Sequence, residues 1–267
     1  MPRTGDPFQT TEFGRWAHGT DLFAAERWML EHYLDPDGSV VEGGTGGGRL
    51  LLALKARGFR QLAGFDFVPA MIEVAKERDA GRQIDFRVQD ATCLDYPDAA
   101  FDQAVYFQQL LSVLHGDEAR RRALRELHRI LKPGGVALFS FLGIEARTRS
   151  FMGRAFLKYL RLYRALTFTR RGRQLLPWLK RGGKFNVGAL WDAGPHVYWF
   201  RIPEVQDMLS AQGFEVFAAG VDHELARGIV HASCAELADR GGAGIIYVAC
   251  RRTECPDRPA LRESGGR

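Results

Sequence analysis

Short apolar runs alternate with amphipathic stretches along most of the chain. Apolar runs of four to eight residues, bounded by glycine, proline or charged residues, are typical of buried strands. Such runs lie at residues 39–42, 61–66, 84–88, 101–107, 136–142, 214–221 and 244–250. Helical spacing of apolar residues predicts helices at 50–57, from Pro69 onward, at 117–131 and from Pro203 to Gly213. This alternation predicts an α/β fold with a mostly parallel sheet and helices on both faces.

The same pattern divides the chain into parts. We expect an N-terminal helical lid at 1–38, a core at 39–144 and 202–251, an insertion at 145–201, and a tail at 252–267. The tail combines proline, glycine and charge without periodicity, which predicts disorder. Within the core, residues 132–135 read Lys-Pro-Gly-Gly and predict a tight turn, because proline fixes φ and glycine accepts a positive φ.

Composition favours one compact domain with an insertion. The chain has 267 residues, of which 46% are hydrophobic. No apolar run approaches the roughly 18–20 residues that cross a bilayer, and the first residues lack the apolar segment of a signal peptide. The four cysteines, at 93, 234, 250 and 255, have no metal-binding spacing, so we expect neither a metal site nor disulfides. These features predict a cytoplasmic protein.

Positive charge is concentrated in the insertion. The whole chain carries a net +5, but residues 145–185 hold twelve Lys or Arg against Glu145 alone, a net +11. The remainder of the chain therefore carries −6. The function of this basic segment must therefore be considered separately from that of the mildly acidic core.

A glycine cluster follows the first predicted strand. Residues 42–48 read Glu-Gly-Gly-Thr-Gly-Gly-Gly, and glycines there let the backbone turn sharply and approach a ligand closely. A dinucleotide fingerprint fails, because the third glycine of G-x-G-x-x-G falls on Arg49 or Leu51. A phosphate-binding P-loop also fails, because Arg49-Leu50 follow where Lys-Ser/Thr is required. What remains is an acidic residue followed by three alternate glycines.

That motif resembles the first motif of the class I S-adenosylmethionine-dependent methyltransferases. The later motifs agree in order: Asp66 ends the second strand, Asp90-Ala91 follow the third, and Leu131 to Gly135 precede the fifth. The resemblance covers about two thirds of the chain. It implies a Rossmann-like fold with a seven-stranded sheet flanked by helices, an N-terminal helical lid and a helical insertion after strand five. It also implies the cofactor S-adenosyl-L-methionine.

Individual roles follow from the resemblance. It implies that Asp66 holds the ribose hydroxyls, since a carboxylate can accept both hydroxyl protons, and that Asp90 and Ala91 lie near the adenine amino group. Residues expected at the cofactor are Glu42, Gly44, Thr45, Gly46, Gly48, Asp66, Phe67, Met71, Asp90, Ala91 and Gln108.

Methyl transfer is an in-line displacement in which a bound, correctly aimed acceptor supplies much of the acceleration. Residues 107–112 after the fourth strand offer no carboxylate, which disfavours a metal, and lack the Asn-Pro-Pro-Tyr motif of base or amide methylation. A base is needed only if the acceptor must lose a proton. Candidate bases are His196, His115 and His18; candidate acceptor contacts are Ser112, Tyr198 and Trp16.

The insertion leaves three hypotheses open. Its apolar residues recur at helical spacing from Phe151 to Leu166, while Arg154, Lys158 and Arg161 fall largely on the other side. It could be a lid that packs apolar residues on the core, a segment at 149–185 that contacts an anionic membrane, or a nucleic-acid contact. The last is disfavoured, because the core is acidic.

We therefore expect methyl transfer to a small, apolar or aromatic, acidic or lipid-like acceptor. An RNA methyltransferase that uses the basic insertion, or a non-catalytic S-adenosylmethionine-binding protein, is the alternative.

Overall fold

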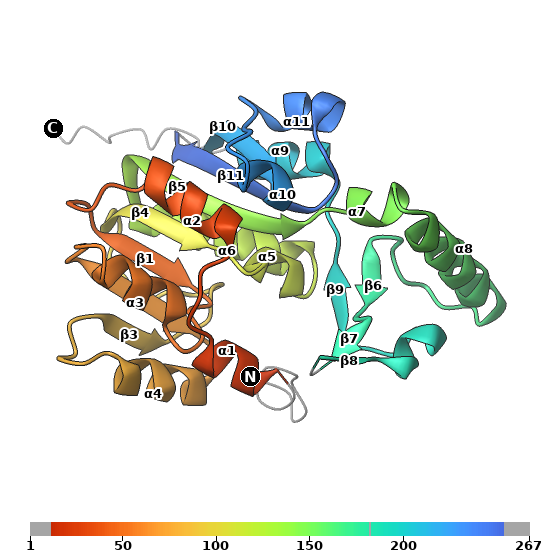
Figure 1. Ribbon diagram of the computed structural model, residues 1–267, viewed down its shortest axis with the longest axis horizontal. Helices are drawn as coiled ribbons and strands as arrows, with labels where there is room; N and C mark the ends of the chain where they lie inside the picture. Colours follow the sequence, from red (N-terminus) through yellow and green to blue (C-terminus); the bar gives the residue numbers. More distant parts are fainter. Residues whose placement is uncertain (1–11, 182, 254–267) are drawn as a thin grey trace, which may run out of the picture.

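The computed structural model describes residues 12–181 and 183–253. A seven-stranded sheet in the order β10-β11-β5-β4-β1-β2-β3 forms the centre of the molecule (Figure 1). Its strands are β1 (Val40–Gly43), β2 (Leu62–Asp66), β3 (Asp85–Val88), β4 (Phe101–Tyr106), β5 (Leu131–Leu142), β10 (Phe214–Val221) and β11 (Ile245–Arg252). Strand β11 pairs antiparallel with both of its neighbours, β5 and β10, and the other strand pairs of this sheet are parallel. The predicted mostly parallel sheet is confirmed.

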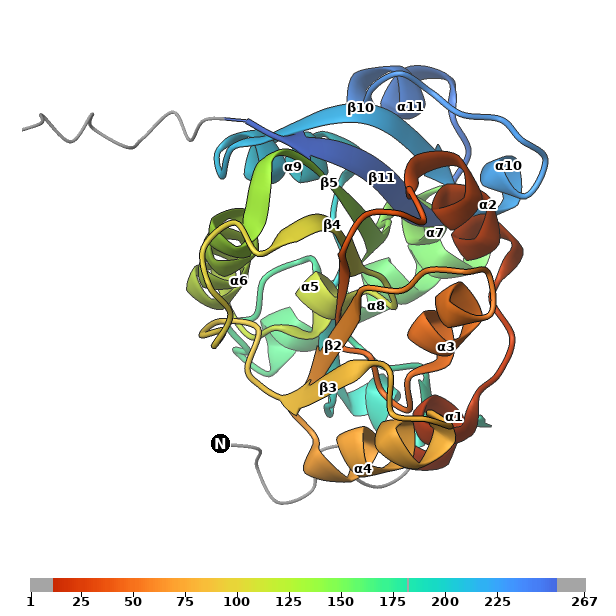
Figure 2. The same cartoon turned by 90° about the vertical axis from the view of Figure 1, so that its left-hand side faces the viewer.

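Helices cover both faces of this sheet (Figure 2). On one face lie α6 (Asp117–Ile130), α9 (Ile202–Ser210) and α11 (Cys234–Arg240), whose apolar residues share one core with the sheet. On the other lie α2 (Ala24–Tyr33), α3 (Arg49–Lys55), α4 (Pro69–Arg78) and α10 (Asp222–Leu225). The short helices α1 (Phe13–His18) and α5 (Leu110–Val113) lie near the carboxyl ends of the parallel strands. That edge is where open α/β sheets bind ligands.

The prediction of a tight turn at residues 132–135 is wrong, because these residues form a bulge within a strand. These residues belong to β5, and the pairing with β4 jumps from Phe101–Leu131 to Gln103–Val136. Gly134 has a φ of +74°. The extra residues are thus accommodated as a bulge inside a long strand, because β5 pairs with β4 on both sides of them.

The insertion is a small unit beside the carboxyl edge of the sheet (Figure 1). It contains α7 (Glu145–Thr148), α8 (Phe151–Leu166), β6 (Leu175–Pro177), β7 (Lys180–Arg181), β8 (Lys184–Phe185), the 3₁₀ helix η2 (Val187–Trp191) and β9 (His196–Tyr198). Strands β6 and β9 pair antiparallel, and a bridge between Gly143 and Phe200 joins the exit and the return of the chain. The tail predicted to be disordered, beyond residue 253, lies outside the described residues.

The packing of α8 corrects the hypothesis that the insertion is a lid whose apolar residues pack on the core. Phe151, Met152 and Leu166 are 78%, 80% and 71% exposed, so most of the apolar stripe does not pack on the core. The buried residues of α8 are Gly153, Leu160 and Arg164. Leu160 packs with Leu176 of the insertion and with Ile144, the last residue of the core segment before it. The helix buries a narrow face against its own hairpin and leaves the wider apolar face uncovered.

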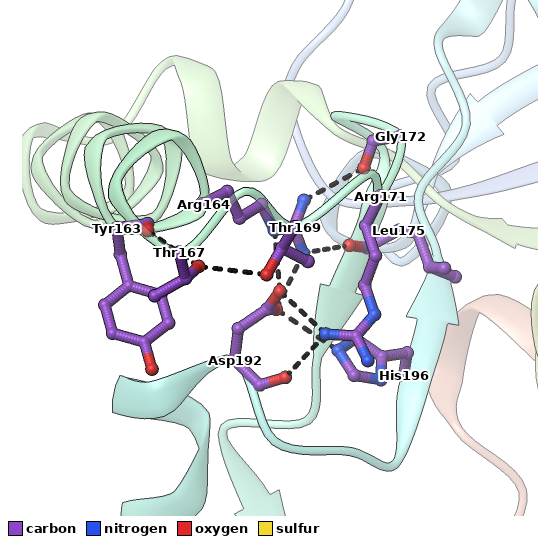
Figure 3. Close-up of polar contacts among 9 residues, drawn as sticks. All are labelled: Tyr163, Arg164, Thr167, Thr169, Arg171, Gly172, Leu175, Asp192 and His196. Atoms are coloured by element: carbon purple, nitrogen blue, oxygen red, sulfur yellow. Dashed lines mark hydrogen bonds and ion pairs between the residues drawn. The ribbon is translucent and has the colours of Figure 1, made fainter.

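A buried ionic cluster holds α8 to the hairpin (Figure 3). Asp192, which is 2% exposed, accepts two hydrogen bonds from Arg164, at 2.8 and 2.7 Å. Arg171 and His196 approach the same carboxylate to 3.0 and 3.1 Å. Arg164 also donates to the carbonyl of Leu175, at the start of β6. One carboxylate thus ties α8 to the hairpin of β6 and β9.

Candidate functional site

The glycine loop between β1 and α3 is shaped by backbone contacts. The amides of Gly44 and Thr45 both donate to the carbonyl of Phe65, at 2.8 and 3.0 Å, which folds the loop back over β2. Gly44, Gly46 and Gly48 all have positive φ, a conformation that other residues rarely adopt. The loop therefore needs the three alternate glycines that the sequence provides.

Helix α1 lies directly on this loop. The amide of Gly47 donates to the carbonyl of Trp16 at 3.0 Å, and a Cβ on Gly47 would collide with the backbone of Ala17. Arg78 of α4 donates to the carbonyls of both Ala17 and Gly47, at 2.9 and 2.8 Å. The N-terminal segment is therefore packed against the predicted cofactor loop.

A cavity of about 710 Å³, counting its space open to solvent, lies beside the loop. Nine of the residues predicted for the site line it: Trp16, Glu42, Gly44, Thr45, Gly46, Asp66, Phe67, Met71 and Gln108. These residues come from α1 and from the segments that follow β1, β2 and β4, so the sheet topology brings them together.

Three residues predicted at the cofactor lie outside this lining. Gly48 faces the ring of Phe86, so its lack of a side chain serves the packing of α3. Asp90 is exposed and accepts hydrogen bonds at 2.8 Å from the amide and the hydroxyl of Thr92. Ala91 is buried in the core. The structure thus shows Asp90 in a local turn.

The candidate bases and two of the acceptor contacts also lie outside the lining. His18 and His115 are exposed, and His196 contacts Asp192 in the insertion. Burial lowers the pKa of His196, against the opposing effect of the Asp192 carboxylate. Ser112 is buried and accepts from the amide of Leu142 at 3.4 Å; the Tyr198 hydroxyl donates to Glu204 at 2.5 Å. Trp16 is the acceptor candidate that does line the cavity.

Five lining residues were not predicted. They are Arg49, Val68, Phe107, Leu110 and Val113. Arg49 follows the last glycine of the loop, a position that could have signalled it. The apolar residues come from segments after β2 and β4. Their sequence has no motif that distinguishes them from buried core residues.

Glu26 of α2 links two sides of the cavity. Arg49 donates two hydrogen bonds to its carboxylate, at 2.7 and 3.0 Å, and Gln108 donates a third. Glu26 has no exposed surface. Gln108 and Gln109 have φ of +53° and +59°, an uncommon conformation for residues other than glycine. Glu26 therefore holds the loop after β1 and the segment after β4 in one arrangement.

Glu42 is buried at the tip of β1 and accepts a hydrogen bond from Thr45 at 2.6 Å. Burial raises the pKa of Glu42 to about 8, although the Thr45 hydroxyl and Arg49 favour the ionised form. The folded protein therefore keeps a proton on Glu42 that the unfolded chain releases near pH 4.5.

This proton makes stability depend on pH. Because the pKa of Glu42 is raised on folding, stability is lost as pH rises from about 4.5 to about 8, by about 1.4 kcal/mol per pH unit. We expect Glu42→Gln to remove that slope. Urea unfolding of both proteins at pH 5.5, 6.5 and 7.5 measures it. A difference in unfolding free energy that stays constant over this range would show that Glu42 titrates normally.

Asp66 has the chemistry needed for a ribose. Its two carboxylate oxygens accept hydrogen bonds from the amides of Gly46 and Val68, both at 2.9 Å, which fix the side chain at the cavity wall. A carboxylate has about four acceptor positions, so one carboxylate can serve these amides and two vicinal hydroxyls. The glycine loop, a fixed carboxylate and an open cavity together fit an adenosyl cofactor.

Comparisons with known proteins agree with this geometry. A family model described as a methyltransferase domain matches residues 41–139. The chain is 42% identical over 112 residues to the ubiquinone/menaquinone biosynthesis C-methyltransferase UbiE of Desulfotalea psychrophila, which is 41% of this chain and 44% of that protein. It is 29% identical over 121 residues to human EEF1A lysine methyltransferase 2, 43% and 51% of the two chains. The matches span about half the length of these relatives.

A solved structure supports the fold. An S-adenosylmethionine-dependent methyltransferase of Methanosarcina mazei superposes with a TM-score of 0.62 at 20% identity, covering 84% of this chain and 97% of the other. At this identity the likeness concerns the fold alone.

Proposed function

We propose that the chain is a class I S-adenosylmethionine-dependent methyltransferase that methylates a small, apolar, lipid-like acceptor in the cavity beside the glycine loop. The observation that carries this proposal is the two-part lining of that cavity. Glu42, Asp66 and the glycine loop offer polar groups at the tips of β1 and β2. Phe107, Leu110 and Val113 add an apolar wall from the segment after β4.

The residues have separate parts in this proposal. S-adenosylmethionine carries its methyl group on a sulfonium, and the thioether that departs is a good leaving group. Asp66 fixes the ribose, the glycine loop admits the nucleoside, and the wall after β4 excludes water and orients the acceptor. In the described part of the chain, no cluster of His, Cys, Asp and Glu is arranged to hold a metal.

The position of the histidines bears on the acceptor. His18, His115 and His196 lie outside the lining, and the ionisable lining residues are Glu42, Arg49 and Asp66. We therefore propose an acceptor that loses its proton without a base from the protein. A phenol, a carboxylic acid or an activated ring carbon has this property. The relative named as a quinone-pathway C-methyltransferase supports a ring acceptor.

An enzyme that acts on a lipid-like acceptor must reach that acceptor in the membrane. No helix in 12–181 or 183–253 is both long enough and apolar enough to cross a membrane. An RNA acceptor remains the alternative that the basic insertion supports, and the lysine methyltransferase relative adds a protein acceptor.

Transfer of a radiolabelled methyl group tests the proposal. The protein is incubated with labelled S-adenosylmethionine and cell extract, which is then separated into organic-soluble, aqueous, RNA and protein fractions. We expect label in the organic-soluble fraction. Label in RNA or protein would contradict the proposed acceptor, and a cofactor-induced rise in melting temperature without any label would favour a non-catalytic binding protein.

A further inference from the structure

The outer face of α8 is apolar and uncovered. Phe151, Ala155, Tyr159, Leu162 and Leu166 recur at steps of three or four residues, so they form one stripe along the helix. All five are exposed, including Leu162 at 61% and Leu166 at 71%. At 100° per residue, this stripe lies opposite the buried Gly153, Leu160 and Arg164. The helix therefore turns its apolar side away from the protein.

Neighbouring segments of the insertion extend this surface. Phe168, Phe185, Val187 and Trp191 are between 56% and 90% exposed. The Tyr159 hydroxyl donates to the carbonyl of Leu190, which places η2 beside α8. Nine of the fourteen exposed large apolar side chains of the described residues lie in 145–201, about a fifth of the chain. We call α8 with Phe168, Phe185, Val187 and Trp191 the outer surface of the insertion.

Basic side chains follow one edge of the stripe. Arg154, Lys158 and Arg161 lie next to it on the helix, and within the described part of the chain no carboxylate forms an ion pair with them. By contrast, Arg164 and Arg171 both form ion pairs with Asp192. The net +11 of residues 145–185 would also repel a second copy of the same surface. The unpaired charges therefore favour an anionic partner.

We propose that the outer surface of the insertion docks on an anionic lipid bilayer. The apolar stripe lies at the boundary between headgroups and acyl chains, while Arg154, Lys158 and Arg161 reach the lipid phosphates. Figure 1 shows α8 at the outer edge of the molecule, beyond the hairpin at the carboxyl ends of the strands. Docking there brings the side of the molecule that holds the cavity towards the bilayer. This reason for docking rests on the proposed lipid-like acceptor.

Vesicle sedimentation tests the docking without cofactor or acceptor. We expect the protein to bind vesicles of phosphatidylcholine with 30% phosphatidylglycerol much more strongly than pure phosphatidylcholine, and less as salt is raised. Replacing Arg154, Lys158 and Arg161 by Gln is expected to weaken partitioning about a hundredfold, from about fivefold per charge. Replacing Phe151, Leu162 and Leu166 by Ser is expected to weaken it by about tenfold per side chain.

Matched controls test whether vesicle binding depends on this surface in particular, and not on the protein's total charge or exposed apolar area. Arg122, Arg125 and Arg240, exposed on α6 and α11, are replaced together by Gln; Val88, Ile229 and Val230 are replaced together by Ser. Both control proteins should bind vesicles as the unchanged protein does. If the triple serine variant does not fold, Leu162→Glu alone tests the stripe.

Several results would overturn the docking. They are equal binding to the two kinds of vesicle, no binding at 0.1 M salt, or equal loss in the control proteins. A dimer in solution that the serine variant converts to a monomer, without vesicle binding, would assign the surface to self-association instead. Failure of methyl transfer alone would refute the proposed function and leave the vesicle result standing, because the two are measured separately.

Discussion

Asp192→Ala is expected to destabilise the insertion by about 3–5 kcal/mol, because it leaves the buried guanidinium of Arg164 without its carboxylate. Although burial opposes its ionisation, hydrogen bonds from Arg164, Arg171 and His196 hold the pKa of Asp192 below its usual range. Thermal unfolding and limited proteolysis measure the loss, and cleavage should concentrate in residues 145–201.

Two further variants sharpen this prediction. Arg171→Gln should cost less than about 1 kcal/mol, because the Arg171 side chain is 41% exposed and solvent screens its charge. The double variant Asp192→Ala with Arg164→Met should recover part of the loss, since it removes both buried charges. An Asp192→Ala protein that unfolds at the temperature of the unchanged protein would show that the cluster contributes no stability.

Asp66→Ala is expected to weaken S-adenosylmethionine binding by about a hundredfold to ten-thousandfold. The estimate rests on two lost hydrogen bonds to a charged acceptor, each about 1.5–3 kcal/mol. Titration calorimetry, or the loss of the cofactor-induced rise in melting temperature, measures the effect. Because Asp66 also accepts from Gly46 and Val68, the melting temperature without cofactor must be compared as well.

Asp90→Ala is the matched control for Asp66. The resemblance places Asp90 near the adenine, whereas the structure shows it exposed in a turn with Thr92. We expect its replacement to change cofactor affinity less than about threefold, the limit of a weak surface contact. A loss comparable to that of Asp66→Ala would mean that the cofactor extends to Asp90.

The strands and the loop could be predicted because their signals are local. Apolar runs mark β1, β2 and β4, and positive φ at Gly44 and Gly46 explains why glycine is needed there. Nine predicted residues then meet at the cavity, because parallel strands end at one edge of the sheet.

Other features depend on distant contacts and could not be predicted. The spacing of apolar residues in α8 showed an amphipathic helix but not which face would be covered, and the structure buries Leu160 while exposing Leu162. The bulge at residues 132–135 arises from pairing of β5 with β4 on either side. The three histidines were candidates by sequence neighbourhood alone, and tertiary packing leaves them outside the cavity lining.

The contact between Glu26 and the cavity sets a limit on shortening this protein. A fragment that starts at β1 would retain every strand and the whole glycine loop, yet it would lack the carboxylate that receives Arg49 and Gln108. It would therefore keep the scaffold and lose the geometry of the pocket. The smallest working unit therefore includes α2 as well as the strands.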